Sequence, residues 1–182
     1  FRMNTIQASS SHATLTSVSH AKRHWLQDHG SLTHRIQERC DNFRVEPTFQ
    51  SLSRVYEDEP NIMNLRRDEL AMVREVYLYC GKQPVIFAHS VVNRGSLRGA
   101  WRGLSGLGNQ SLGTVLFTNP KVKRTALEFK KLKKDHFIFD RASQRLGHTP
   151  SSLWARRSLF TLQGQSILVT EVFLPAILDL AS

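Results

Sequence analysis

Two pairs of alternating, strand-like segments dominate the pattern of hydrophobic and polar positions. Residues 71–80 (AMVREVYLYC) and 84–93 (PVIFAHSVVN) are rich in β-branched and aromatic residues and flank the short segment GKQ. Residues 152–162 (SLWARRSLFTL) and 166–175 (SILVTEVFLP) repeat this arrangement around QGQ. Strand-forming segments joined by a short turn that contains glycine are typical of β-hairpins. The sequence therefore predicts two antiparallel hairpins.

Helical patterns lie outside these hairpins. Residues 20–40 predict one helix, a break at Gly30, and a second helix for which Ser31 is a suitable N-cap. Residues 96–117 predict a further helical stretch that contains several glycines. Because the helices are inserted between antiparallel hairpins, the order of the elements predicts an α+β fold, with a single domain built on an antiparallel β-sheet.

The remaining segments are less regular. Residues 42–53 (NFRVEPTFQSLS) predict a short strand that is interrupted near Pro47, because proline cannot donate a ladder hydrogen bond. Loops are expected over residues 53–69 and 141–152. The basic segment 121–134 is compatible with either a strand or a helix.

Length and composition fit one domain preceded by a tail. The chain has 182 residues, of which 40% are hydrophobic and 22% are charged, which is ordinary for a globular protein. Residues 1–20 are rich in serine and threonine and lack acids, so we expect a mobile N-terminal tail and a domain over residues 21–182. No apolar run approaches the ~20 residues of a membrane-spanning helix, so we expect no stable membrane insertion.

Cysteines and histidines give no sign of a metal centre. The wide spacing of the two cysteines, Cys40 and Cys80, matches neither a zinc motif nor a disulfide framework. We therefore expect reduced thiols in a cytoplasmic protein. The eight histidines form no metalloprotease motif, so we expect no metal. His89 shares a predicted strand face with apolar residues, which favours a core role over a catalytic one.

Positive charge is concentrated in one segment. The net charge is +10, and residues 121–134 carry seven basic residues and one acid, which is +6 of that total. Such a segment can attract nucleic acid, lipid headgroups or small anionic metabolites, or it can simply be a solvated face that improves solubility. We expect no nucleic acid partner, because aromatic residues do not alternate with the basic ones as they do in RNA-binding strands.

Two charges lie where strand alternation predicts apolar surroundings. Arg74 shares its strand face with Val76 and Leu78, and Glu171 lies within the apolar run 167–175. A buried charge is costly unless it is paired or hydrogen-bonded. One explanation is a structural ion pair between the two residues. The other is a pocket in the sheet, where Arg74 binds a carboxylate and Glu171 binds a hydroxyl group of one small ligand.

Taken together, the motifs resemble the chorismate pyruvate-lyase family. In chain order they are WLQDHGSLTHRI, REVYLY, VIFAHSVV, LGNQSLGTVLF, SLWARRSLF and ILVTEVFLP. They cover roughly residues 25–175. Asn93 and Ser111 stand where this family commonly has proline, and the segment 121–152 is longer and richer in lysine than is usual for it.

The resemblance implies an enzyme that eliminates pyruvate from chorismate to give 4-hydroxybenzoate for ubiquinone biosynthesis, without a cofactor. It also implies a chorismate-lyase-like fold, and we expect a monomer. Carried over by motif, Arg74 and the backbone N–H of Leu112 would bind the ring carboxylate. Glu171 would hold the ring hydroxyl, and Leu32 would line the pocket. Arg74 and Glu171 would thus be the catalytic residues.

Two mechanistic questions stay open at this point. Glu171 can act as a base, or it can only hold the hydroxyl while the proton passes to the departing enolpyruvyl arm. Chorismate also has a second carboxylate, for which Arg156 or Arg157 is a candidate. Because neighbouring residues of a strand point to opposite faces, only one of these two arginines can face the site.

A rival interpretation is a non-enzymatic sensor of small aromatic acids. The effector domains of one family of transcription regulators resemble the same fold. Such a regulator needs a DNA-binding domain, and the roughly 25–30 residues ahead of the resemblance are too few for one.

Overall fold

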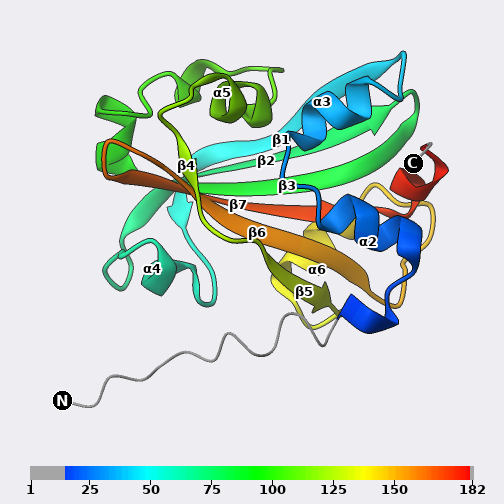
Figure 1. Cartoon of the computed structure of the whole chain (residues 1–182). Helices are drawn as coiled ribbons and strands as arrows, with labels where there is room; N and C mark the ends of the chain where they lie inside the picture. The colour runs from blue at the N-terminus through cyan, green and yellow to red at the C-terminus, as the bar shows by residue number, and fades with distance from the viewer. Residues whose placement is uncertain (1–14, 181–182) are drawn as a thin grey trace.

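A seven-stranded antiparallel sheet forms the centre of the molecule (Figure 1). The computed structural model describes residues 15–180. The strands follow the order β1-β2-β3-β7-β6-β4, and β5 also pairs with β6. Their bounds are β1 Phe43–Arg54, β2 Leu70–Cys80, β3 Gln83–Asn93, β4 Lys123–Arg124, β5 Glu128–Leu132, β6 Leu153–Leu162 and β7 Gln165–Phe173.

The two predicted hairpins are confirmed as β2–β3 and β6–β7. Each turn contains a glycine in the left-handed region, Gly81 at φ 57° and Gly164 at φ 74°, where a side chain would be strained. The hairpins pair with each other through β3 and β7. The predicted α+β fold with an antiparallel sheet is therefore confirmed.

Short helices and 3₁₀ turns connect the strands. They are η1 Leu15–Ser17, α2 His20–Leu26, α3 Leu32–Gln37, α4 Glu59–Ile62, η2 Arg94–Arg98, η3 Leu104–Gly106, α5 Leu112–Thr118, α6 Phe137–Ser143 and η4 Pro175–Asp179. The two helices predicted on either side of Gly30 are confirmed as α2 and α3. Ser31 caps α3 as predicted, because its Oγ accepts a hydrogen bond of 3.3 Å from the backbone N–H of His34.

Three predicted segments differ in detail. The helical stretch predicted over 96–117 is broken into η2, η3 and α5, because its glycines lower the helical propensity of the segment. Strand β1 is longer than expected, and its register shifts between Pro47 and Phe49, which is the interruption that the proline predicts. The basic segment forms the strands β4 and β5, and the two predicted loops partly overlap α4 and α6.

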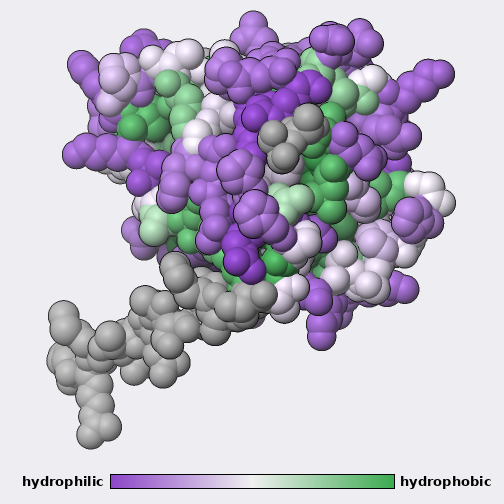
Figure 2. All heavy atoms as spheres, turned by 45° about the vertical axis from the view of Figure 1, so that its right-hand side comes forward, coloured by the Kyte–Doolittle hydropathy of each residue, from purple (hydrophilic) through white to green (hydrophobic). Residues whose placement is uncertain are grey.

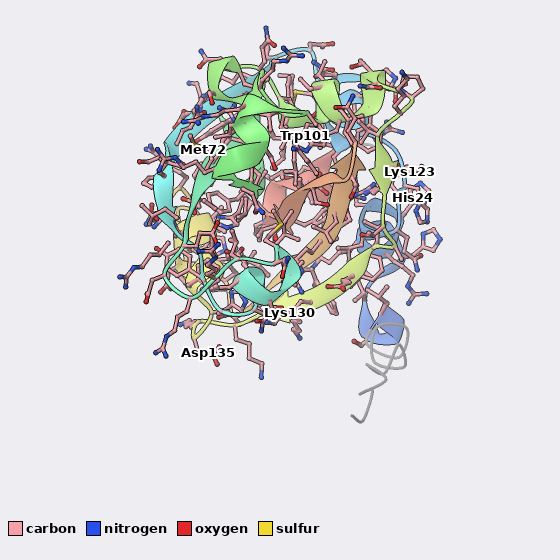
Figure 3. All side chains as sticks on the ribbon, turned by 90° about the vertical axis from the view of Figure 1, so that its left-hand side faces the viewer. His24, Met72, Trp101, Lys123, Lys130 and Asp135 are labelled. Atoms are coloured by element: carbon pink, nitrogen blue, oxygen red, sulfur yellow. A yellow bond between two sulfur atoms is a disulfide. The ribbon has the colours of Figure 1, made fainter. Side chains whose placement is uncertain are left out.

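Helices cover both faces of the sheet. In Figure 1, α3 and α5 lie above the sheet, and α4 and α6 lie below it. Trp25, Trp101 and Trp154 are all buried, and Figure 3 shows Trp101 inside the molecule. Figure 2 shows a mostly hydrophilic surface that is interrupted by several hydrophobic patches. No helix between residues 15 and 180 is long and apolar enough to cross a membrane.

The expectation of reduced thiols is wrong, because Cys40 and Cys80 form a disulfide with their Cα atoms 5.8 Å apart. The two cysteines are 40 residues apart in the sequence. However, the pairing of β1 with β2 places Phe43 opposite Cys80, and this brings the segment after α3 close to the end of β2. Spacing along the chain could not reveal this proximity.

The predicted division into a mobile tail over 1–20 and a domain over 21–182 stays a prediction. Residues 1–14 lie outside the described residues. Within the described part of the predicted tail, Leu15 and Val18 are buried in the same hydrophobic cluster as Trp25.

Candidate active site

The strand register places Arg74 and Glu171 on the same face of the sheet. Arg74 of β2 lies opposite Ser90 of β3, which lies opposite Val169 of β7. Glu171 lies opposite Ala88 of β3, and residues directly opposite one another share a face. Strand β3 lies between the strands of Arg74 and Glu171, and the two residues are offset by two positions along the strand direction. The usual distance between strands and the usual rise per residue therefore put their Cα atoms about 12 Å apart.

A cavity lies between this face and the helices α3 and α5. It holds about 530 Å³ of space between atoms, including the part that is open to solvent. It is lined by Leu32, Thr33, Arg74, Val76, Leu78, Ala88, Ser90, Ser111, Leu112, Gly113, Leu116, Phe117, Phe160, Val169 and Glu171. All four residues that the resemblance implies as site residues, Leu32, Arg74, Leu112 and Glu171, therefore line one cavity.

Arg74 is a buried cation without a carboxylate partner. The residue is 6% exposed, and its guanidinium donates to Gln50 Oε1 at 2.7 Å and to the carbonyl oxygens of Gly108 and Gln110 at 3.0 and 2.9 Å. These acceptors are neutral, and no carboxylate in the part of the chain that the structure describes forms an ion pair with Arg74. Burial accordingly lowers the pKa of Arg74, because desolvation disfavours the charged form.

Glu171 is held by other arginines. Its Oε2 accepts a hydrogen bond of 2.6 Å from Arg156 Nε and lies 3.8 Å from Arg124 Nη2. Its Oε1 accepts no hydrogen bond from residues 15–180, so this oxygen can accept one from a ligand. The alternative of a structural ion pair between Arg74 and Glu171 is therefore wrong, and a cavity lies beside both residues.

The two neighbouring arginines of β6 take different faces. Arg156 lies opposite Glu171 and points to the cavity side, where it also donates to the carbonyl oxygens of Leu26 and Asp28. Arg157 points to the opposite face, where it binds Asp58 and Glu128. The question that alternation left open is thus decided in favour of Arg156, although its side chain is completely buried.

Helices α3 and α5 meet closely at the cavity wall. Ser111 caps α5 by accepting a hydrogen bond of 3.1 Å from Gly113 N–H, and its Oγ lies 2.5 Å from Thr33 Oγ1. A Cβ atom at Gly113 would lie only 2.9 Å from Thr33 Oγ1, so a larger residue there would force Thr33 or one of the helices to shift. Leu112 begins α5, where the first N–H groups have no acceptor within the helix.

Arg124 adjoins the cavity through Glu171, Phe117 and Phe160, and the sequence analysis missed it because it was counted within the basic segment. Its Nε donates to Ser158 Oγ at 2.8 Å, and its Nη1 donates to the carbonyl oxygen of His29 at 3.1 Å. Its guanidinium lies 4.9 Å from the ring centroid of Phe160 and 5.6 Å from that of Phe117. Burial lowers the pKa of Arg124 to about 10, although Glu171 opposes the shift. No local pattern separates Arg124 from the lysines around it.

The opposite face of the sheet carries a second cluster of buried charges. His89 Nδ1 lies 3.0 Å from Glu75 Oε1 and His89 Nε2 lies 2.9 Å from Glu59 Oε1, although the geometry of the second contact is too poor for a hydrogen bond. Arg141 Nε donates to Glu75 Oε2 at 2.6 Å. Burial opposes the charge on His89, but the two acids outweigh it and raise the pKa of His89 to about 9. The predicted buried position of His89 is confirmed.

Residues 15–180 contain no group of three or more histidine, cysteine, aspartate or glutamate side chains arranged to hold a metal ion. The charged residues of both faces instead contact one another and the backbone.

Comparison with protein families identifies similar sequences over almost the whole chain. A family model described as chorismate lyase matches residues 5–182. A probable chorismate pyruvate-lyase from Nitrosospira multiformis is 66% identical over 180 residues, which is 98% of this chain and 100% of the relative. Another from Nitrosomonas europaea is 65% identical over 153 residues, which is 84% of this chain and 86% of that relative.

Solved structures of low sequence identity share the fold. PhnF from Mycobacterium smegmatis matches with a TM-score of 0.58 at 12% identity, over 85% of this chain and 67% of that one. A GntR-family transcriptional regulator from Bacillus cereus matches with a TM-score of 0.56 at 10% identity, over 77% of this chain and 96% of that one. At these identities the likeness shows the fold alone.

Proposed function

The chain belongs to the chorismate lyase family, and we propose that it removes pyruvate from chorismate in the cavity beside Arg74 and Glu171. The other product is 4-hydroxybenzoate, which serves ubiquinone biosynthesis. The observation that supports this site is the buried Arg74, which has only neutral acceptors among the described residues and lines the cavity. An anionic ligand would supply the charge that the protein does not provide.

The ring carboxylate binds Arg74 in this proposal. A guanidinium has five N–H donors, and the three acceptors of Arg74 fix its plane while donors remain for a ligand. The N–H of Leu112, at the start of α5, adds a neutral donor from the cavity wall. Leu32 and other apolar residues of the lining contact the ring and exclude water from it.

The hydroxyl end of the ring meets Glu171. Arg156 fixes Oε2 of this carboxylate, which leaves Oε1 to accept a hydrogen bond from the ring hydroxyl. The ligand is thus held at both ends by groups on β2 and β7, which the shared strand β3 keeps at a fixed separation.

The reaction is an elimination that makes the ring aromatic. The bond between the ring carbon and the ether oxygen breaks, and its electrons leave with the enolpyruvyl group. The neighbouring ring carbon, which carries the hydroxyl, loses a proton, and the C–H electrons complete the aromatic ring. The released enolpyruvate gains a proton at its methylene carbon and becomes pyruvate, so all atoms and electrons balance.

The protein contributes mainly orientation and exclusion of water. Holding the arm and the ring in the reactive arrangement can contribute up to ~7–11 kcal/mol in favourable cases. Glu171 takes the ring proton, or it holds the hydroxyl while the departing arm takes the proton. A cavity with an apolar lining strengthens each charged contact to the substrate.

The test is the rate at which 4-hydroxybenzoate forms from chorismate, followed by absorbance. The parent enzyme should turn over chorismate, and Glu171→Gln should lower kcat by about 10²–10⁴-fold if Glu171 is the base. A much smaller loss would favour proton transfer to the arm. Glu128→Gln, a matched change on the exposed strand β5, should leave kcat unchanged. Absence of turnover by the parent would contradict the proposed function.

The sensor alternative predicts binding of aromatic acids without turnover, so the same assay separates it from the enzyme. A cytoplasmic location, a monomeric state and the absence of a nucleic acid partner remain proposals. The location has a specific difficulty, because the structure contains a disulfide between Cys40 and Cys80 and stable disulfides are rare in the cytosol.

A further inference from the structure

The substrate and the aromatic product differ in charge. Chorismate carries two carboxylates, one on the ring and one on the enolpyruvyl arm, whereas 4-hydroxybenzoate carries one. The inference below rests on the proposed function, in which Arg74 binds the ring carboxylate. The arm carboxylate then needs a second cation within reach of the cavity.

Arg156 is poorly placed for that role. Its side chain is 0% exposed, its Nε is bound to Glu171, and its Nη1 is bound to backbone carbonyl oxygens. Its Nη2 is buried without an acceptor among the described residues. Two of the three guanidinium nitrogens of Arg156 are thus occupied and the third is closed off from solvent, so its evident role is to fix Glu171.

Arg124 is held in place but keeps one nitrogen available. Its Nε and Nη1 are bound to Ser158 and to the carbonyl oxygen of His29, so the guanidinium is fixed to two different parts of the fold. Its Nη2 makes no hydrogen bond within residues 15–180, and its nearest carboxylate oxygen there is Glu171 Oε2 at 3.8 Å. The side chain is 13% exposed, so Nη2 is not sealed as that of Arg156 is.

The position of Arg124 matches the position of the arm. The enolpyruvyl ether is on the ring carbon next to the one that carries the hydroxyl, so a hydroxyl bound to Glu171 places the arm close to Glu171. Arg124 lies beside this carboxylate, over the rings of Phe117 and Phe160, which both line the cavity. The arm carboxylate and Arg124 therefore come together at the same end of the cavity.

The charges around the cavity favour a dianion. Glu171, the one carboxylate among the lining residues, contacts the guanidiniums of Arg124 and Arg156, and Arg74 lines the same cavity without a carboxylate partner among the described residues. The next acid, Asp28, forms its own ion pair of 2.7 Å with Arg35. The three arginines and Glu171 together leave a net charge of +2. The single carboxylate of the product would neutralise half of this charge, whereas the two carboxylates of the substrate would neutralise all of it.

We propose that Arg124 binds the enolpyruvyl carboxylate of chorismate and thereby distinguishes the substrate from the aromatic product. Arg124 comes from β4, which pairs with β6 at the edge of the sheet. Figure 3 shows its neighbour Lys123 on this edge strand. In this proposal a strand of the basic segment contributes a substrate-binding residue, because Arg124 adjoins the lining residues Glu171, Phe117 and Phe160, whereas its neighbour Lys123 is exposed.

The test compares two ligands in one variant. In Arg124→Gln, KM for chorismate should rise about 10–100-fold, as expected for the loss of a charge-assisted contact. The inhibition constant of 4-hydroxybenzoate, which lacks the arm, should change by less than about twofold. Arg124→Lys should recover part of the affinity for chorismate. Lys123→Gln, on the same strand but exposed, is the matched control and should alter neither constant.

Three outcomes would overturn the proposal. The first is an equal loss of affinity for chorismate and 4-hydroxybenzoate, which would mean that Arg124 only supports the cavity. The second is an unchanged KM for chorismate. The third is a loss that Arg124→Lys does not relieve at all. If the parent itself lacked turnover, the proposed function would fail, and equilibrium titration with both ligands would still test Arg124.

Discussion

The two faces of the sheet bury charge in different ways. On the cavity face, Arg74 is buried with neutral acceptors and has no carboxylate partner in the described part of the chain. On the opposite face, His89 lies between Glu59 and Glu75, and Arg141 completes the cluster. The first arrangement leaves a charge for a ligand, whereas the second neutralises its own charges. Burial of a charge therefore does not by itself identify a binding site, but burial without a countercharge beside a cavity does.

The opposite face also shows that the volume of a hollow does not by itself identify a binding site. It contains a hollow of about 640 Å³, larger than the 530 Å³ of the cavity beside Arg74. Its charged lining residues are paired, for example Arg157 with Asp58 and Glu128 and His136 with Glu57. A hollow whose charges already have partners offers less to an ionic ligand than a smaller one with an unmatched cation.

The largest expected effect is a loss of stability from a change on the face that carries His89, Glu75 and Arg141. Glu75→Gln would leave the buried His89 and the partly exposed Arg141 with one partner fewer, so the free energy of unfolding should fall by about 3–5 kcal/mol. Urea unfolding measures this loss. The folded fraction should retain kcat/KM within about twofold. A variant that kept its stability but lost its activity would show that the two faces had been assigned the wrong roles.

The next effect is the converse change on the cavity face. In Arg74→Met, kcat/KM for chorismate should fall by at least a hundredfold, about 3 kcal/mol, because a buried contact to a charged ligand is lost. The free energy of unfolding should change by less than about 1 kcal/mol, since the cost of burying an unpaired cation disappears together with its hydrogen bonds. Steady-state kinetics and urea unfolding of the same preparation give both numbers. Wild-type turnover in Arg74→Met would remove the basis for the proposed site.

The smallest expected effect is a pH dependence of the free energy of unfolding, which arises from the face that carries His89. The pKa of His89 is raised to about 9 in the folded protein, above the value of ~6.5 in an unfolded chain. The protonated form therefore stabilises the fold fully below pH ~6.5, and about 3 kcal/mol of this stability should be lost progressively as the pH rises through 9. Chemical unfolding at several pH values measures the slope. In Glu75→Gln the slope should be much flatter, and an equal slope would assign it to another group.

The sequence pattern was sufficient to predict those features that depend only on the alternation of side chains along one strand. The unusual faces of Arg74 and Glu171 could be recognised within their own strands, and the two hairpins could be recognised from strand-forming segments around short glycine turns. The family motifs then pointed to Leu32 and Leu112, which line the same cavity. Pattern failed for the helical stretch 96–117, because glycine weakens a helix without fixing which turns survive.

The sequence by itself determined the antiparallel sheet, the α+β class and the faces of the two misplaced charges, because these follow from the two-residue period of a strand. The tertiary structure alone decided how those charges are matched. Arg124 meets Ser158 and His29 from 34 and 95 residues away, and Cys40 meets Cys80 across 40 residues. Such contacts depend on strand order and register, which bring distant segments together and leave no periodic signal in the segments themselves.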